Sequence, residues 1–137
     1  MRIMAVDLGD ARTGLAVSDA GGLIAGDAWI IKEWDAGKIA DAIVREAESR
    51  QVGRIVLGYP KNMDGTVGPR AEKSEQFAAL LGAKTEIPVV LWDERRTTVD
   101  AHRILSDSGV HGKKRTNTVD AVAATLILEG YLNRKQD

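Results

Sequence analysis

The chain begins with an apolar run that ends at a carboxylate, and this run restricts the possible folds more than any other segment. Residues 3–6 read Ile-Met-Ala-Val, and Asp7 follows them directly. Because side chains alternate between the two faces of a sheet, consecutive apolar residues predict a strand that is buried on both faces. Such a strand lies in the middle of its sheet, and its end places Asp7 at the sheet edge. A carboxylate there costs free energy unless a partner or a bound ion offsets it.

The residues after Asp7 predict a hairpin. A short turn containing Gly9 and Asp10 separates residues 2–7 from a second apolar run at residues 13–19. Two such runs joined by a short turn pair as antiparallel strands. Residues 23–31 predict a third strand. Taken alone, this segment is also compatible with a purely structural role, in which Asp7 or Asp10 is a turn residue whose carboxylate accepts hydrogen bonds from nearby backbone.

From residue 35 onward, helical and strand-like patterns alternate. Apolar residues at helical spacing predict helices, and short apolar runs between turn signals predict strands. The predicted segments are, in order, a helix capped by Asp35 and ending near residues 51–53, a strand at 54–59, a loop at 60–68, a helix beginning at Pro69, a strand at 88–92, a helix beginning at Thr97 or Thr98, a polar loop at 108–117, and a final helix capped by Thr116, Asn117 or Thr118 with an apolar face from Val119 to Tyr131.

This order predicts an α/β fold with a five-stranded mixed sheet, made of a three-strand antiparallel meander and two parallel strands and flanked by helices. Residues 1–137 are expected to form a single domain. Connection rules place the first strand in the middle, parallel to the strands at 54–59 and 88–92. The carboxyl ends of these strands then share one edge, which is where open α/β sheets bind ligands.

Three acids are expected at or near that edge. Asp7 ends the first strand, Glu94 follows the strand at 88–92, and Asp120 is predicted in the first turn of the last helix. Carboxylates that lie close together repel unless a cation holds them. Ligation by oxygen alone suits Mg²⁺ or Mn²⁺, and a two-metal site hydrolyses phosphodiesters. Singly, each acid also has a structural explanation: a turn, an ion pair, or the dipole of the helix.

Composition excludes several other classes of site. The chain has no cysteine, so it can form neither a disulfide framework nor a thiolate zinc site. Its net charge is −1 at pH 7, which neither supports nor excludes nucleic-acid binding. It has no apolar stretch long enough to span a membrane, and its N-terminus lacks a signal-peptide pattern. These features fit a cytoplasmic protein.

Four motifs in register resemble the RuvX/YqgF family. They are Asp7-x-Gly9-x-x-Arg12-x-Gly14-x-Ala16-x-Ser18-Asp19, Gly58-x-Pro60-x-Asn62-Met63-Asp64-Gly65, Asp93-Glu94-Arg95-x-Thr97-Thr98, and Lys113-Lys114-Arg115 followed by Val119-Asp120-x-x-Ala123-Ala124-x-x-Ile127-Leu128. The family is described as Holliday junction resolvases and as nucleases that mature precursor 16S ribosomal RNA, with a ribonuclease H-like fold. The resemblance implies that Asp7, Glu94 and Asp120 are the catalytic, metal-binding acids. The departures, Tyr59 and Arg96, do not affect these acids.

Other residues near the predicted site suit substrate binding. A guanidinium at Arg12 or Arg95 either holds a phosphate or orients the acids. Asn62 either contacts nucleic acid or stabilises its own turn. The basic run before the last helix is expected to neutralise backbone phosphates rather than only to face solvent. The predicted substrate-binding residues are therefore Arg12, Asn62, Arg95, Lys113, Lys114 and Arg115.

The sequence thus favours a metal-dependent nuclease acting on structured nucleic acid, either precursor ribosomal RNA or branched DNA. One alternative is a non-catalytic nucleic-acid-binding module of the same fold. Another is a nucleotide-phosphate hydrolase or sugar kinase, because similar Asp-x-Gly turns hold phosphates in actin-like folds. Those folds need two lobes, and this chain has the length of one. Both a monomer and a homodimer are compatible with the sequence.

Overall fold

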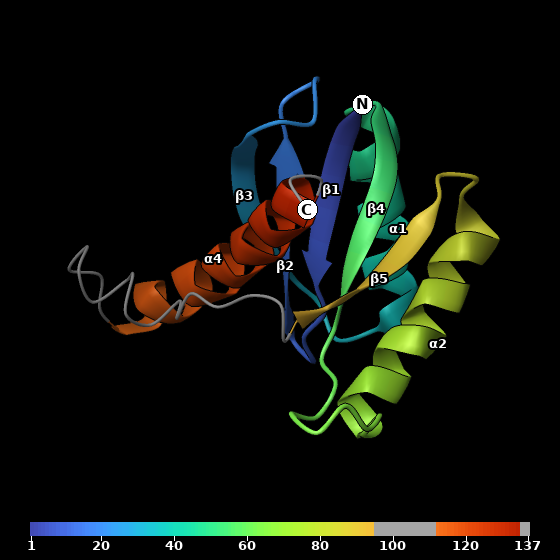
Figure 1. Ribbon diagram of the computed structural model, residues 1–137, viewed down its shortest axis with the longest axis vertical. Helices are drawn as coiled ribbons and strands as arrows, with labels where there is room; N and C mark the ends of the chain where they lie inside the picture. Colours follow the sequence, from blue (N-terminus) through green and yellow to red (C-terminus); the bar gives the residue numbers. More distant parts are fainter. Residues whose placement is uncertain (95–111, 135–137) are drawn as a thin grey trace.

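The computed structural model describes residues 1–94 and 112–134, with the side chains of the last helix described from residue 121 onward. A five-stranded sheet has the order β3-β2-β1-β4-β5 (Figure 1). Its strands are β1 (Arg2–Asp7), β2 (Arg12–Ser18), β3 (Ala25–Lys32), β4 (Val52–Tyr59) and β5 (Val89–Asp93). β1 pairs antiparallel with β2 and parallel with β4, and β4 pairs parallel with β5. The predicted mixed sheet, with the first strand in its middle, is confirmed.

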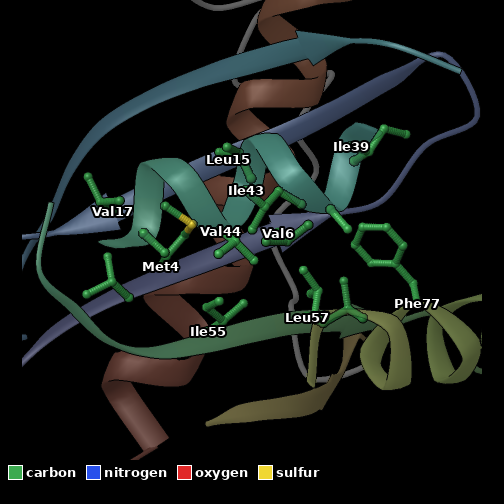
Figure 2. Packing of buried hydrophobic residues seen from close by; sticks show 14 residues of the cluster. Met4, Val6, Leu15, Val17, Ile39, Ile43, Val44, Ile55, Leu57 and Phe77 are labelled. Carbon is green, nitrogen blue, oxygen red and sulfur yellow. The ribbon is translucent and has the colours of Figure 1, made fainter. Parts of the chain in front are cut away.

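Helices cover both faces of the sheet. Helices α1 (Ala36–Ser49) and α2 (Pro69–Lys84) pack on one face, and α4 (Gly112–Asn133) crosses the other (Figure 1). On the α1 side, Ile43 and Val44 point toward Met4 and Val6 of β1 (Figure 2). On the α4 side, the cluster contains Ala5 of β1 and buried residues of α4, which are Ala124, Ile127, Leu128, Tyr131 and Leu132. β1 is therefore buried on both faces, as its apolar run predicts.

The local signals that start α1 and α2 act as predicted. The Asp35 carboxylate accepts a hydrogen bond of 3.0 Å from the Lys38 amide and caps α1. Pro69 is the first residue of α2, where its missing N–H leaves no hydrogen bond unmade. α1 ends at Ser49, and Gln51 follows with a φ of 58°. This left-handed conformation reverses the chain into β4.

The third strand begins later than predicted. β3 starts at Ala25 rather than Leu23, and Leu23 and Ile24 are 77% and 69% exposed. Their backbone amides donate hydrogen bonds of 2.8 and 3.1 Å to Asp19 Oδ1. The Asp19 side chain thus holds these two residues in a turn, and the apolar pattern alone does not reveal this local competition.

The last helix begins earlier than predicted. Residues 112–117 belong to α4 rather than to a polar loop, so Thr116, Asn117 and Thr118 lie inside the helix and do not cap it. Asp120 is consequently not in the first turn. Lys and Arg are good helix formers, and a polar composition does not stop a helix. The amphipathic stripe marks where the helix is packed, not where it begins. The helix predicted from Thr97 or Thr98 lies outside the described residues.

No helix in the described ranges 1–94 and 112–134 combines the length and the apolar character needed to cross a membrane.

Candidate active site

The parallel strands bring Asp7 and Glu94 to the same edge of the sheet. Val6 pairs with Leu57 in the β1–β4 ladder, and Tyr59 pairs with Asp93 in the β4–β5 ladder. Asp7 is the last residue of β1, and Glu94 follows the last residue of β5. β4 lies between the two acids, at the carboxyl edge predicted from the connections.

Asp7, at the end of β1, and Glu94, just after β5, lie on the side of the sheet that faces α4. Ile3 and Ala5 of β1 belong to the apolar cluster under α4, and so do Val90 and Trp92 at the β5 edge. Side chains two residues apart share a face of a strand, which assigns Asp7 to this side. Glu94 is on the same side, because its Oε2 atom and Cδ1 of Ile127 in α4 both lie within 3.0 Å of a Cβ built on Gly58. Figure 1 shows α4 lying across this face, with its later turns over β1.

Gly58 makes room for the Glu94 carboxylate. A Cβ atom added to Gly58 would lie 2.7 Å from Glu94 Oε2 and 2.8 Å from Ile127 Cδ1. Neither distance is compatible with a real carbon atom, so any larger residue at position 58 must displace one of these neighbours. The Glu94 carboxylate therefore packs directly against the β4 backbone, between the ends of β1 and β5.

The surroundings of Glu94 favour its protonated form. Burial is the largest influence and raises the pKa of Glu94 above its ordinary value. The positive charge of Arg70 acts in the opposite direction, and the neighbouring Asp93 carboxylate raises the pKa further. A cation bound beside this partly buried carboxyl group would offset both effects and favour the ionised form of Glu94.

A cavity of about 290 Å³ opens beside Glu94. It lies between the turn after β1, the end of β4 and the first turns of α2. Its walls are formed by Leu8, Gly9, Asp10, Gly58, Pro60, Pro69, Arg70, Lys73, Ser74 and Glu94. Arg70 and Lys73 were not singled out from the sequence. The signal was available, because a helix that begins just after the β4 loop must start at the same sheet edge as Asp7.

An ion pair joins two walls of this cavity. Lys73 Nζ lies 2.6 Å from Asp10 Oδ1, linking α2 to the turn after β1. The hydrogen bond and the charge of Lys73 lower the pKa of Asp10, and Arg70 adds a smaller effect in the same direction. Of the two turn acids considered from the sequence, Asp10 thus serves as the partner of a helix lysine.

The remaining predicted residues are less closely grouped. Arg12 is exposed at the start of β2, on the strand side shared with Ala16. Asn62 Nδ2 donates a 2.9 Å hydrogen bond to Thr66 Oγ1, and its backbone closes the same turn, so Asn62 stabilises its own loop. Asp120 lies in α4, four residues before the buried Ala124. The basic residues Lys113, Lys114 and Arg115 lie at the start of α4, and Arg95 lies outside the described residues.

Among the side chains described, at residues 1–94 and 121–134, no three acidic or histidine residues form a group able to hold a metal ion. The Asp120 side chain lies outside this set, so the structure describes the side chains of only two of the three predicted acids, Asp7 and Glu94.

The fold defines the chain as a ribonuclease H-like protein. Thermus thermophilus RuvC, solved in complex with a Holliday junction substrate, has this fold, with a TM-score of 0.64 at 12% identity over 98% of this chain and 96% of that one. Residues 1–134 match the model of the family described as "RuvX: Holliday junction resolvase". The chain belongs to the RuvX family.

Relatives share this family over nearly their full length. A protein of Halothermothrix orenii named "Putative pre-16S rRNA nuclease" is 44% identical over 133 residues, covering 97% of this chain and 95% of its own. A protein of Geobacillus sp. with the same name is 45% identical over 138 residues, covering 99% and 100%. The sequence resemblance to this family is confirmed.

The fold is also related to that of sugar kinases, as the turn after β1 suggested. A ROK hexokinase from Thermus thermophilus has a TM-score of 0.50 at 23% identity, but the match covers 71% of this chain and only 36% of the hexokinase. The likeness extends to the fold of one part of that enzyme and supports no shared activity.

Proposed function

We propose that this chain is a metal-dependent nuclease that hydrolyses phosphodiester bonds in structured nucleic acid in the cytoplasm. The observation that carries the proposal is the placement of Asp7 and Glu94 at one sheet edge, on either side of β4, in a member of the RuvX family. Precursor 16S ribosomal RNA is the first substrate to test, because relatives more than 40% identical carry that name. Branched DNA is the second, from the family description.

The donor atoms at this edge fit a hard divalent cation. Asp7 and Glu94 supply carboxylate oxygens, which Mg²⁺ and Mn²⁺ prefer. The raised pKa of Glu94 fits the same assignment, since a cation offsets the cost of a buried carboxylate. Asp120 is the proposed third ligand. Its place one helical turn before Ala124, which is buried against the sheet, supports this role.

The chemistry follows from this set of ligands. One or two bound ions would supply a Lewis acid for the phosphate and a water of lowered pKa. The chain itself fixes the acids on rigid strand ends, and Gly58 leaves space for the Glu94 carboxylate beside β4. Arg12 is proposed to bind a substrate phosphate from the start of β2. Lys113, Lys114, Arg115 and Arg95 are proposed as further phosphate contacts, and Asn62 is proposed to hold the loop that borders the site.

The test is cleavage with and without metal. Purified protein is offered a precursor 16S RNA fragment and a four-way DNA junction, each with Mg²⁺, with Mn²⁺ and with chelator. We expect metal-dependent cleavage of at least one substrate, and a loss of at least about 100-fold in Asp7→Asn, because a lost ligand costs more than a lost supporting contact. Asp27→Asn is the matched control, since Asp27 is 79% exposed and lies on the distant strand β3.

Two results would contradict the proposal. Full activity in Asp7→Asn would remove that residue from the mechanism. Tight binding of both substrates without cleavage under every metal condition would instead identify a non-catalytic binding module. Native mass measured in the same preparations decides between a monomer and a homodimer.

A further inference from the structure

One wall of the cavity beside Glu94 carries an arginine that forms no ion pair with any acid in the described part of the chain. Arg70 is exposed and lines the cavity together with Glu94 and Asp10. It forms no ion pair within 4.0 Å among the described residues, whereas its neighbour Lys73 is paired with Asp10. Its charge nevertheless acts on both carboxyl groups: it adds to the lowering of the Asp10 pKa and opposes the rise in the Glu94 pKa. Arg70 therefore stands near two acids and is bound to neither.

The charges around this edge create a need for such a group. Asp7, Asp10, Asp93 and Glu94 all lie at or just beyond the ends of β1 and β5. A polyanionic backbone that approaches an edge lined with acids binds better where cations lie close to its path. Lys73 is already occupied by Asp10. The Arg70 guanidinium has no ion-pair partner among the residues that the structure describes, and its planar fork matches a phosphate better than a lysine does.

The cavity has the size and the walls for one backbone unit. Its volume of about 290 Å³ is roughly that of ten water molecules at about 30 Å³ each, which accommodates a phosphate and part of its sugar. Pro60 and Pro69 form fixed apolar walls, and the Glu94 carboxylate forms one end. The cavity thus borders Glu94, one of the proposed metal ligands.

We propose that this cavity is the subsite for the backbone phosphate adjacent to the cleaved bond, with Arg70 as the residue that contacts it. The proposal rests on the proposed nuclease function and deepens it. It also gives the substrate a second point of contact. The basic run at the start of α4 belongs to the helix on the opposite face of the sheet from α2 (Figure 1).

The experiment measures binding apart from catalysis. Arg70→Gln is compared with wild type for equilibrium binding of the labelled RNA fragment and the labelled four-way junction, by fluorescence anisotropy in chelator over a salt series. We expect about 3- to 10-fold weaker binding at moderate salt, and a salt slope reduced by about one for the lost phosphate contact. Arg45→Gln is the matched control, because Arg45 is exposed on α1 and does not line the cavity.

Further measurements separate a contact from an indirect effect. With metal present, Arg70→Gln is expected to raise KM and leave kcat within about twofold, as for a group that binds substrate and transition state equally. Arg70→Lys keeps the charge and loses the fork, so its salt slope should match wild type while its affinity falls between the two. Thermal melts check that each variant is folded.

Three outcomes would overturn the subsite. Affinity and salt slope equal to wild type in Arg70→Gln would show that Arg70 does not touch the backbone. A fall in kcat with unchanged KM would mean that Arg70 acts through Glu94 and not on the substrate. Wild-type protein that neither binds nor cleaves either substrate would defeat the proposed function itself, whereas the first two outcomes leave that function standing.

Discussion

The Glu94 carboxylate occupies the space that a side chain on residue 58 would need. Cβ on Gly58 would lie 2.7 Å from Glu94 Oε2 and 3.1 Å from Glu94 Cδ. The glycine of β4 and the acid after β5 are thus a matched pair. The pair explains why the strand between the two acids has a glycine as its penultimate residue, although strands disfavour glycine.

Gly58→Ala is predicted to damage the site more than the fold. The added methyl group must displace either the Glu94 carboxylate or Ile127, at a stability cost of about 1–3 kcal/mol. We expect at least a tenfold loss of cleavage and weaker Mn²⁺ binding, measured by titration calorimetry. Gly82→Ala in α2 is the control, because a Cβ there meets nothing within 4 Å, and alanine should stabilise the helix by roughly 0.5 kcal/mol. Unchanged Mn²⁺ affinity in Gly58→Ala would count against this pairing.

Glu94 is predicted to make the metal-free protein less stable as pH rises. Its pKa is raised by burial, so the folded state holds the proton more tightly than the unfolded state does. Stability from this group is present at low pH and is lost as pH rises from the ordinary glutamate pKa through the raised folded pKa. Glu94→Gln should therefore unfold at higher temperature than wild type at pH 7 in chelator, and the difference should vanish in acid. Glu86→Gln, at an exposed position, should show no such pattern.

Gln51 is predicted to be replaceable by glycine with a gain in stability. Its φ of 58° is left-handed, a conformation that costs a residue with a side chain about 1–2 kcal/mol. Glycine removes this cost, but its greater conformational entropy in the unfolded chain offsets part of the gain. We expect Gln51→Gly to raise the free energy of unfolding by about 0.5 kcal/mol in a urea titration. Arg45→Gly, inside the same helix, should lower it by about 1 kcal/mol. A loss of stability in both variants would contradict the conformational explanation.

Ile43 is predicted to be the residue through which α1 holds the sheet. Its side chain is fully buried in the cluster that contains Met4, Val6 and Leu57 (Figure 2). Ile43→Ala should cost about 2–5 kcal/mol, measured by chemical unfolding, because it leaves a cavity that the close-packed sheet cannot fill. Leu23→Ala removes a similar side chain that is 77% exposed, and it should change stability by less than about 0.5 kcal/mol.

The sheet could be predicted because the signals that specify it lie in short segments of the sequence. The uninterrupted apolar run before Asp7 requires burial on both faces, and short connections fix the neighbours of each strand. Asp7 and Glu94 were placed at one edge by the same reasoning. Asp120 was assigned to the last helix correctly but to the wrong turn, because the helix extends past its apolar stripe.

The predicted start of α2 places Arg70 and Lys73 near this edge, but it does not predict their contacts. The contact of Lys73 with Asp10 depends on how the loop after β4 returns α2 to the turn after β1, and these two residues are 63 positions apart in the sequence. In the sequence Arg70 and Lys73 are two basic residues on an exposed helix face, a pattern that most helices share. Similarly, the later start of β3 depends on the hydrogen bonds that Asp19 makes to two particular amides.

The central position of β1 also has a consequence for biosynthesis. β1 and β2 are synthesised before β4, and the hairpin that they form completes one edge of β1 early. Its other edge awaits β4, which ends at Tyr59, so at about 5–20 residues per second that edge stays open for roughly 3–10 s. An apolar strand with an unpaired edge readily pairs with other chains. The nascent protein is therefore most prone to aggregation before the acids of its sheet edge have come together.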